Sequence, residues 1–249
     1  RCTGENEMIS NKSSSNTYRY NTLLDSPGGE LTLRHGNDCQ VYGNTFRSTG
    51  GIRIFGDRHQ VFSNYLETST GINIGNGDGE VADGAPLTSH DRPDHCVITF
   101  NTLVSCGRNY FQQGRTAGLG AIDTTFADNV IQGGGSAAGL SGPYVGGTWG
   151  GNVIWQTNGP GAMPAGTFDE VDPRLAPDAN GVFRPQAGSP LLNSAVGVFP
   201  AVTVDLDGQP RPGAPAKDRG ADEVSAAPRV GRFLTPEVLL AMMRSWLDL

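Results

Sequence analysis

The sequence predicts an all-β fold, a right-handed parallel β-helix (solenoid) followed by a short C-terminal α-helix. Three observations support this prediction. An Asn-containing motif recurs through the first 155 residues, apolar and polar residues alternate around its copies, and helix-favouring residues are scarce before the last fifteen positions. With 36 Gly and 16 Pro among 249 residues, the chain is rich in residues that form tight turns. Many short strands joined by turns are therefore expected.

The repeat has the length of one solenoid coil. Asn followed by Thr, Tyr or Val and then by an aliphatic residue or Phe occurs at Asn21, Asn44, Asn64, Asn101, Asn129 and Asn152. The steps are 23, 20, 37, 28 and 23 residues, and the longest step indicates an insertion. Strands and turns repeating every ~20 residues predict a β-solenoid in which Asn side chains at one turn position hydrogen-bond along the stack. We therefore assign these asparagines to the fold and not to the chemistry.

The composition changes twice along the chain. Residues 1–224 are expected to form the β-helix domain, with 160–224 as irregular closing turns because this stretch is rich in Pro, Gly and Asp. Residues 225–249 are expected to form a linker and the helix, with Thr235 as N-cap and Pro236 at the first helical position. An apolar stripe on this helix predicts packing on the solenoid or against a second chain, hence a monomer or a homodimer through the helix.

The charge distribution indicates the kind of partner. The formal net charge is −7, yet residues 1–60 hold seven Lys or Arg against six Asp or Glu. A modest basic region on an acidic protein favours an acidic polysaccharide and argues against nucleic acid, which requires a broad basic face. No stretch approaches the ~20 apolar residues of a membrane span, so no membrane partner is expected. We expect a secreted or periplasmic bacterial protein whose signal peptide and first coils lie upstream of this chain.

Charged residues gather on three successive coils. Residues 4–16, 28–37 and 50–59 occupy corresponding parts of the repeat, so their strands are expected to stack ~4.8 Å apart. Side chains that point away from the lumen then form a ladder of Glu5, Glu7, Lys12, Arg34, His35 and Arg53. Carboxylates and cations within three rungs point to a functional site.

Four segments carry a specific resemblance. NEMISNKSSSN, LTLRHGN, VYGNTF and GGIRI, in this order and at coil spacing, look like the core motifs of polysaccharide lyase family 6. That family includes alginate lyases and the dermatan-cleaving chondroitinase B. The resemblance covers roughly residues 4–105 well and the closing turns loosely.

The resemblance implies a role for each matching position. Lys12 matches the Brønsted base and Arg34 the general acid, whereas His35 and Arg53 match positions that line the substrate groove. Glu5 and Glu7 match acidic ligands of a calcium ion (Ca2+), whose remaining ligand is expected to be an Asn from a coil upstream of this chain.

The chemistry of uronate β-elimination agrees with these residue types. Removal of the C5 proton converts the neighbouring carboxylate to a dianion-like enolate, which a hard divalent cation stabilises. Lys12 is the base. Arg34 lies close to the leaving oxygen, where it either donates a proton or stabilises the alkoxide while water supplies the proton, because an Arg side chain is a weak acid.

Several functions remain open at this stage. Alginate, as poly-mannuronate or mixed mannuronate and guluronate, is the first expected substrate, and dermatan sulfate or chondroitin is the second. A β-helix glycoside hydrolase with Glu5 and Glu7 as paired carboxylates leaves Lys12 and Arg34 without a role. A non-catalytic β-helix that binds polyanionic glycan is the alternative outside enzymology.

Overall fold

The computed structural model describes residues 5–86, 88–213 and 217–230 and shows stacked coils of short parallel strands. One 11-stranded sheet contains two faces of the stack. Its first face consists of β1 (Glu7–Lys12), β3 (Thr22–His35), β5 (Thr45–Ile54), β8 (Gly71–Ile74), β11 (Asn109–Gln112) and β15 (Ala138–Leu140). Its second face continues through β7 (Tyr65–Glu67), β10 (Thr102–Val104), β14 (Val130–Gln132), β18 (Asn152–Trp155) and β19 (Phe168–Glu170).

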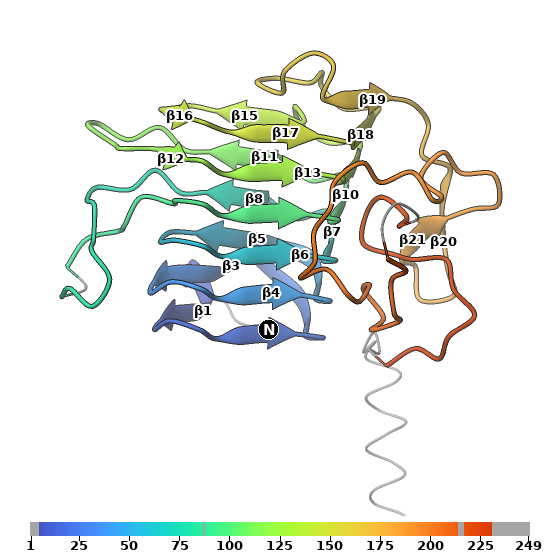
Figure 1. The fold of residues 1–249 in the computed structure, drawn as a ribbon, viewed down its shortest axis with the longest axis horizontal. Coiled ribbons are helices and arrows are strands. Elements are labelled where there is room, and N and C mark those ends of the chain that lie inside the picture. Colours follow the sequence, from blue (N-terminus) through green and yellow to red (C-terminus); the bar gives the residue numbers. More distant parts are fainter. Residues whose placement is uncertain (1–4, 87, 214–216, 231–249) are drawn as a thin grey trace, which may run out of the picture.

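A second sheet, of six strands, forms the remaining side (Figure 1). It contains β2 (Thr17–Arg19), β4 (Gln40–Tyr42), β6 (Gln60–Phe62), β9 (Val97–Thr99), β13 (Thr125–Ala127) and β17 (Thr148–Gly150). Two smaller pairs are the parallel β12 (Ala121–Ile122) and β16 (Tyr144–Val145), and the antiparallel β20 (Leu175–Pro177) and β21 (Phe183–Pro185). Sheets made of such parallel coils are consistent with a β-helix-like fold.

The expected fold class needs one correction. It included a short C-terminal α-helix, but the residues that the structure describes are all-β and contain no α-helix. The segment predicted to be helical, 235–249, lies outside those residues. The physical reason for the error is that a capped amphipathic pattern of about 15 residues is marginal as a helix by itself and depends on packing that a sequence does not reveal.

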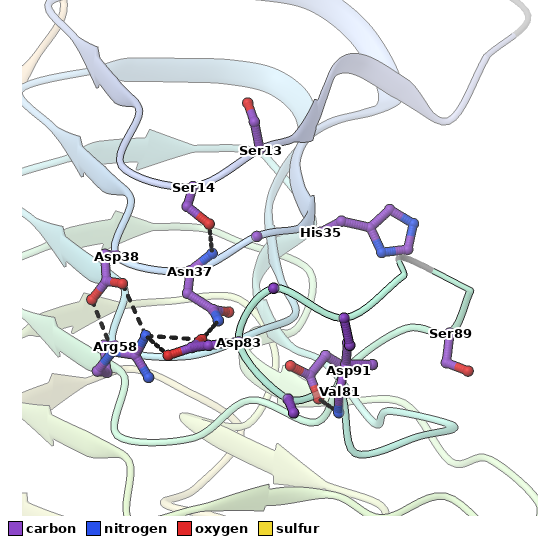
Figure 2. A pocket seen from close by; sticks show the side chains of 14 residues that line it. Ser13, Ser14, His35, Asn37, Asp38, Arg58, Val81, Asp83, Ser89 and Asp91 are labelled. Carbon is purple, nitrogen blue, oxygen red and sulfur yellow. Dashed lines mark hydrogen bonds and ion pairs between the residues drawn. The ribbon is translucent and has the colours of Figure 1, made fainter.

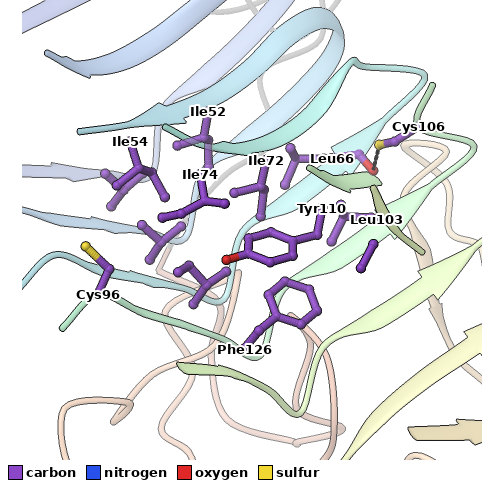
Figure 3. Packing of buried hydrophobic residues seen from close by; sticks show 14 of the residues in the cluster. Ile52, Ile54, Leu66, Ile72, Ile74, Cys96, Leu103, Cys106, Tyr110 and Phe126 are labelled. Atoms are coloured by element: carbon purple, nitrogen blue, oxygen red, sulfur yellow. Dashed lines mark hydrogen bonds between the residues drawn. The ribbon is translucent and has the colours of Figure 1, made fainter. Parts of the chain in front are cut away.

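Stacked apolar side chains fill the lumen of the coils (Figure 3). Leu31, Ile52, Ile72 and Tyr110 occupy one register position on β3, β5, β8 and β11, and all four are fully buried. The Tyr110 ring stacks on Phe126 with ring centroids 4.1 Å apart. Because side chains alternate along a strand, the residues between these positions point outward, and on the first face this outward row includes Arg53.

The repeated asparagines form a ladder at one turn. The Nδ2 of Asn44 donates to the Oδ1 of Asn64 at 3.0 Å, and the Nδ2 of Asn64 donates to the Oδ1 of Asn101 at 3.0 Å. The pattern continues through Asn129 to Asn152. Each side chain also donates to a backbone carbonyl, as Asn64 does to Val41 at 2.8 Å. The asparagines thus satisfy buried polar groups between coils.

Glycine allows the coils to approach closely beneath the charged face. Gly51 has a φ of 87°, and a Cβ at this position would lie 2.0 Å from the carbonyl oxygen of Gly71. A side chain is therefore excluded at Gly51, which explains the second glycine of the GGIRI segment.

The segment after β21 runs along one side of the stack, beside β6, β7 and β10 (Figure 1). Ser63 donates to the carbonyl of Val204 at 2.9 Å, and Thr102 accepts the backbone N–H of Ala221 at 2.8 Å. We call residues 195–224 the closing segment. No helix long and apolar enough to span a membrane occurs in the described part of the chain.

Candidate active site

Three neighbouring strands bring the predicted cations together. Lys12 ends β1 and pairs in register with His35 at the end of β3, and Thr32 of β3 pairs with Arg53 of β5. Lys12 is exposed, whereas the side chains of Arg34 and Arg53 are 35% and 23% exposed. The structure therefore places four predicted residues on one face: Lys12, Arg34, His35 and Arg53. Lys12 is the most exposed of them and lies on β1, the outermost described strand.

Glu7 forms an ion pair with Arg34. The Nη1 of Arg34 donates to the Oε1 of Glu7 at 2.9 Å. Burial opposes ionisation of Glu7, but hydrogen bonds from Ser10 and Arg34 and the charges of Arg34 and Arg53 outweigh it and lower the pKa of Glu7. Glu7 is thus an anion at neutral pH. Glu5, its predicted partner in a metal site, is exposed at the start of the described chain.

A third carboxylate, Glu30, was missed by the sequence reasoning. Glu30 pairs in register with Glu7, and its Oε2 lies 3.9 Å from the Nη1 of Arg53. Burial, opposed by Arg53 and reinforced by the charge of Glu7, raises the pKa of Glu30 to about 7. Glu30 directly precedes the LTLRHGN segment, and this position could have identified it from the sequence as a residue of the site.

The insertion between β8 and β9, residues 75–96, contributes a histidine to the same face. The His90 ring stacks on His35 with centroids 5.9 Å apart and contacts Phe55 at 4.7 Å. Burial lowers the pKa of both imidazoles, aided by nearby Arg34 and, for His35, by Lys12. Both rings are therefore neutral at neutral pH, and with Phe55 they form an apolar platform beside the cations. His90 lies in the longest step of the Asn repeat and was not among the site residues predicted from the sequence.

A cavity of about 360 Å³ lies beside His35, under the tip of the insertion (Figure 2). Arg58 lines it, with its Nε 2.9 Å from Asp38 and its Nη2 3.1 Å from Asp83. Asn37 donates to Asp83 at 2.5 Å. These polar groups largely bind one another. The contacts of Asp83 with Asn37 and Arg58 hold the insertion next to the charged face.

Metal-ligand side chains also meet away from the charged face. Among the described residues, ligand atoms of Asp94, His95 and Asp123 lie within 4.8 Å of one another. His95 and Asp123 are exposed. This is a possible metal-binding group, and it is separate from the predicted ligands Glu5 and Glu7.

Comparisons with known proteins show which family part of the chain resembles. Residues 1–119 match the family model described as Chondroitinase B. A mutant of the PL6 family alginate lyase AlyGC shows a TM-score of 0.66 and 30% identity, covering 76% of this chain and 27% of that chain. AlyGC itself shows a TM-score of 0.66 and 27% identity, covering 82% of this chain and 31% of that chain. No curated protein matches the sequence significantly.

A further solved relative is a mannuronic acid specific polysaccharide family 6 lyase from human gut microbiota. Its TM-score is 0.52 at 28% identity, covering 68% of this chain and 38% of that chain. The chain therefore spans about a third of the length of these three solved structures.

Proposed function

Residues 1–119 of this chain belong to the chondroitinase B family of polysaccharide lyase family 6, and from this premise we propose that the protein cleaves a uronate-containing acidic polysaccharide by β-elimination. The observation that carries the proposal is the placement of Lys12, Arg34, His35 and Arg53 on three adjacent strands of one face. A paired-carboxylate hydrolase does not use this set of cations.

The proposed mechanism begins at Lys12. Its amine is exposed at the end of β1, where it can remove the C5 proton of a uronate lying across the strands. Arg34, on the adjacent strand, supplies positive charge at the leaving C4 oxygen, and Glu7 holds its guanidinium in place. Arg53 lines the substrate groove beyond the reacting uronate, and the neutral rings of His35 and His90 give the sugar an apolar surface.

We propose calcium as the metal, held by Glu5 and Glu7. The chemical type of these donors fits, since calcium prefers carboxylate oxygens and Glu7 is ionised. Burial, with a smaller contribution from the charge of Glu7, raises the pKa of the adjacent Glu30 to about 7, and a bound cation would favour its ionised form. Bound calcium would neutralise the substrate carboxylate. Alginate is the proposed substrate because AlyGC is an alginate lyase and a third relative is specific for mannuronic acid.

The first test follows the unsaturated uronate by its ultraviolet absorbance. The chain is incubated with alginate and with dermatan sulfate, each with calcium and with a chelator. A rise in absorbance on alginate, reduced by the chelator, is expected. Lys12→Ala should lower kcat/KM by about 10²–10⁴-fold, the usual contribution of a positioned base. Arg19→Ala, which removes an exposed cation of β2 on another sheet, should leave the rate unchanged.

Other products contradict the proposal. New reducing ends without the chromophore indicate hydrolysis, and binding without cleavage indicates a glycan-binding module.

Arg34 is tested by two substitutions in the same assay. Arg34→Ala should nearly abolish the rate, and substantial activity in Arg34→Lys would show that positive charge suffices without the guanidinium.

A further inference from the structure

A small polar pocket lies further along the charged face than Lys12 and Arg34. Its volume is about 50 Å³, and its lining includes Arg53, Phe55, Asn73, Asn76, Gln113 and Arg115. Lys12 ends β1 and Arg115 follows β11, so four strand spacings separate them along the order β1, β3, β5, β8 and β11. At ~4.8 Å per spacing, the far edge of the pocket lies ~19 Å from Lys12, measured along the stack of strands.

Two polar atoms in this pocket lack partners. Asn73, which pairs in register with Arg53, is 3% exposed, and its Oδ1 has no hydrogen-bond partner among the described residues. The Nε of Arg53 is also buried without a partner within the described chain. Buried polar groups are normally satisfied, so an acceptor and a donor left open in one pocket indicate a ligand or ordered water.

The insertion holds Arg115 at the pocket edge. Asp78 accepts from the Nη1 of Arg115 at 2.7 Å through Oδ2 and from the backbone N–H of His90 at 2.7 Å through Oδ1. The Arg115 side chain remains 31% exposed. Arg53 lies on the other side, with its guanidinium carbon 4.8 Å from the centre of the Phe55 ring. Two guanidinium groups thus border a pocket with an apolar wall.

We propose that this pocket is a distal subsite that binds the carboxylate of a second uronate unit of the same polysaccharide. Arg115 is its specificity-determining residue, pairing with the carboxylate together with Arg53, and Asn73 accepts a hydrogen bond from a sugar hydroxyl. Guanidinium groups are suited to carboxylates because they donate two parallel hydrogen bonds. The inference rests on the proposed function, since it names where a longer substrate binds.

The test measures binding separately from turnover. In a Lys12→Ala background, calorimetry compares oligomannuronates of increasing length with carboxyl-reduced, neutral versions of the same sugars. Arg115→Ala should weaken binding about tenfold for oligosaccharides long enough to reach the pocket, the loss of one charge-assisted hydrogen bond. Short oligosaccharides and the neutral sugars should bind both variants equally. In the Lys12-containing protein, KM should rise with kcat nearly unchanged.

Two controls separate recognition from a structural role. Asp78→Asn removes the ion pair but keeps Arg115, so it should retain binding if Arg115 contacts the sugar and should reproduce Arg115→Ala if Arg115 only anchors the insertion. Arg174→Ala removes an exposed cation of the closing turns and should change nothing. Equal binding of long acidic sugars by Arg115→Ala and its parent overturns the subsite. Absence of unsaturated product from the unmodified chain overturns the lyase instead.

Discussion

Glu30 illustrates how burial and charge compete at a single residue. It lies between the anion Glu7 and the cation Arg53, and its side chain is only 13% exposed. Loss of hydration outweighs the attraction of Arg53, so the pKa of Glu30 rises to about 7. The charged face therefore contains a carboxyl group that titrates near neutral pH beside the proposed catalytic cations.

This residue should make folding stability depend on pH. Because the folded-state pKa of Glu30 is raised from 4.5 to about 7, the folded protein keeps a proton that the unfolded chain loses. The resulting stability is fully present below about pH 4.5 and is lost as pH rises through about 7. In the parent, the free energy of unfolding should fall by on the order of 3 kcal/mol between about pH 4.5 and 7 because of Glu30, and Glu30→Gln should abolish this fall.

Chemical denaturation at about pH 4.5 and pH 8 measures the effect of Glu30 as a difference between variant and parent. Glu170→Gln, at an exposed carboxylate of β19, serves as the control and should follow the parent at both pH values. A parallel decline in Glu30→Gln and the parent would contradict the role of Glu30.

At the scale of elements, long strands and a turn ladder hold the coils in register. β3 and β5, with 14 and 10 residues, extend over two faces of the stack, and β5 pairs with both β7 and β8. The face that carries Arg34 and Arg53 is thereby tied to the face beneath the closing segment. The Asn ladder fixes the turns that precede β3, β5, β7, β10 and β14, and it ends at Asn152, the first residue of β18.

Loss of a central asparagine should destabilise the stack. Asn64 is fully buried, donates to Val41 and Asn101, and accepts from both the backbone and the side chain of Asn44. Asn64→Ala should lower the free energy of unfolding by about 3 kcal/mol, because buried partners lose their hydrogen bonds. Asn21→Ala, at the exposed end of the ladder, should have a smaller effect in the same urea titration. Equal losses would show that position in the ladder is irrelevant.

At the scale of the whole molecule, the closing segment is bound to the coils through buried polar contacts. Asp128 accepts the backbone N–H groups of Val196 and Gly197 at 3.0 and 2.9 Å. Arg211, whose side chain is fully buried, pairs with Glu223 at 3.0 Å and lies over the ring of Phe100 at 4.9 Å. The contacts with Asp128 and Phe100 join residues 195–224 to coils more than 60 positions earlier in the chain, whereas the Arg211–Glu223 pair lies within the closing segment.

Removal of the Arg211 side chain should release this segment. Arg211→Ala leaves Glu223 buried without its ion-pair partner. The free energy of unfolding is therefore expected to fall by about 3–5 kcal/mol. Limited proteolysis with thermolysin, read by mass spectrometry, should show cleavage within 195–224 before any cleavage of the coils. Arg174→Ala should give the pattern of the parent. Simultaneous loss of coils and closing segment would instead indicate a single cooperative unit.

The sequence alone determined the features that depend on local spacing. The Asn repeat predicted stacked parallel coils, and coil spacing placed Lys12, Arg34, His35 and Arg53 on one face, because strand pairing follows directly from a repeat length. The helix predicted for 235–249 rested on a local pattern whose stability depends on packing, and it is not part of the described all-β structure.

Only the tertiary structure decided which partners these residues have. Arg34 pairs with Glu7 across 27 positions, Glu30 is buried between Glu7 and Arg53, and His90 reaches His35 through the insertion. Arg115 depends on Asp78 in the same way. Side-chain direction, burial and the path of an insertion arise from packing between distant segments, and the repeat does not encode them. The residue types of the site are therefore readable in the sequence, whereas their charge states and contacts are set by the fold.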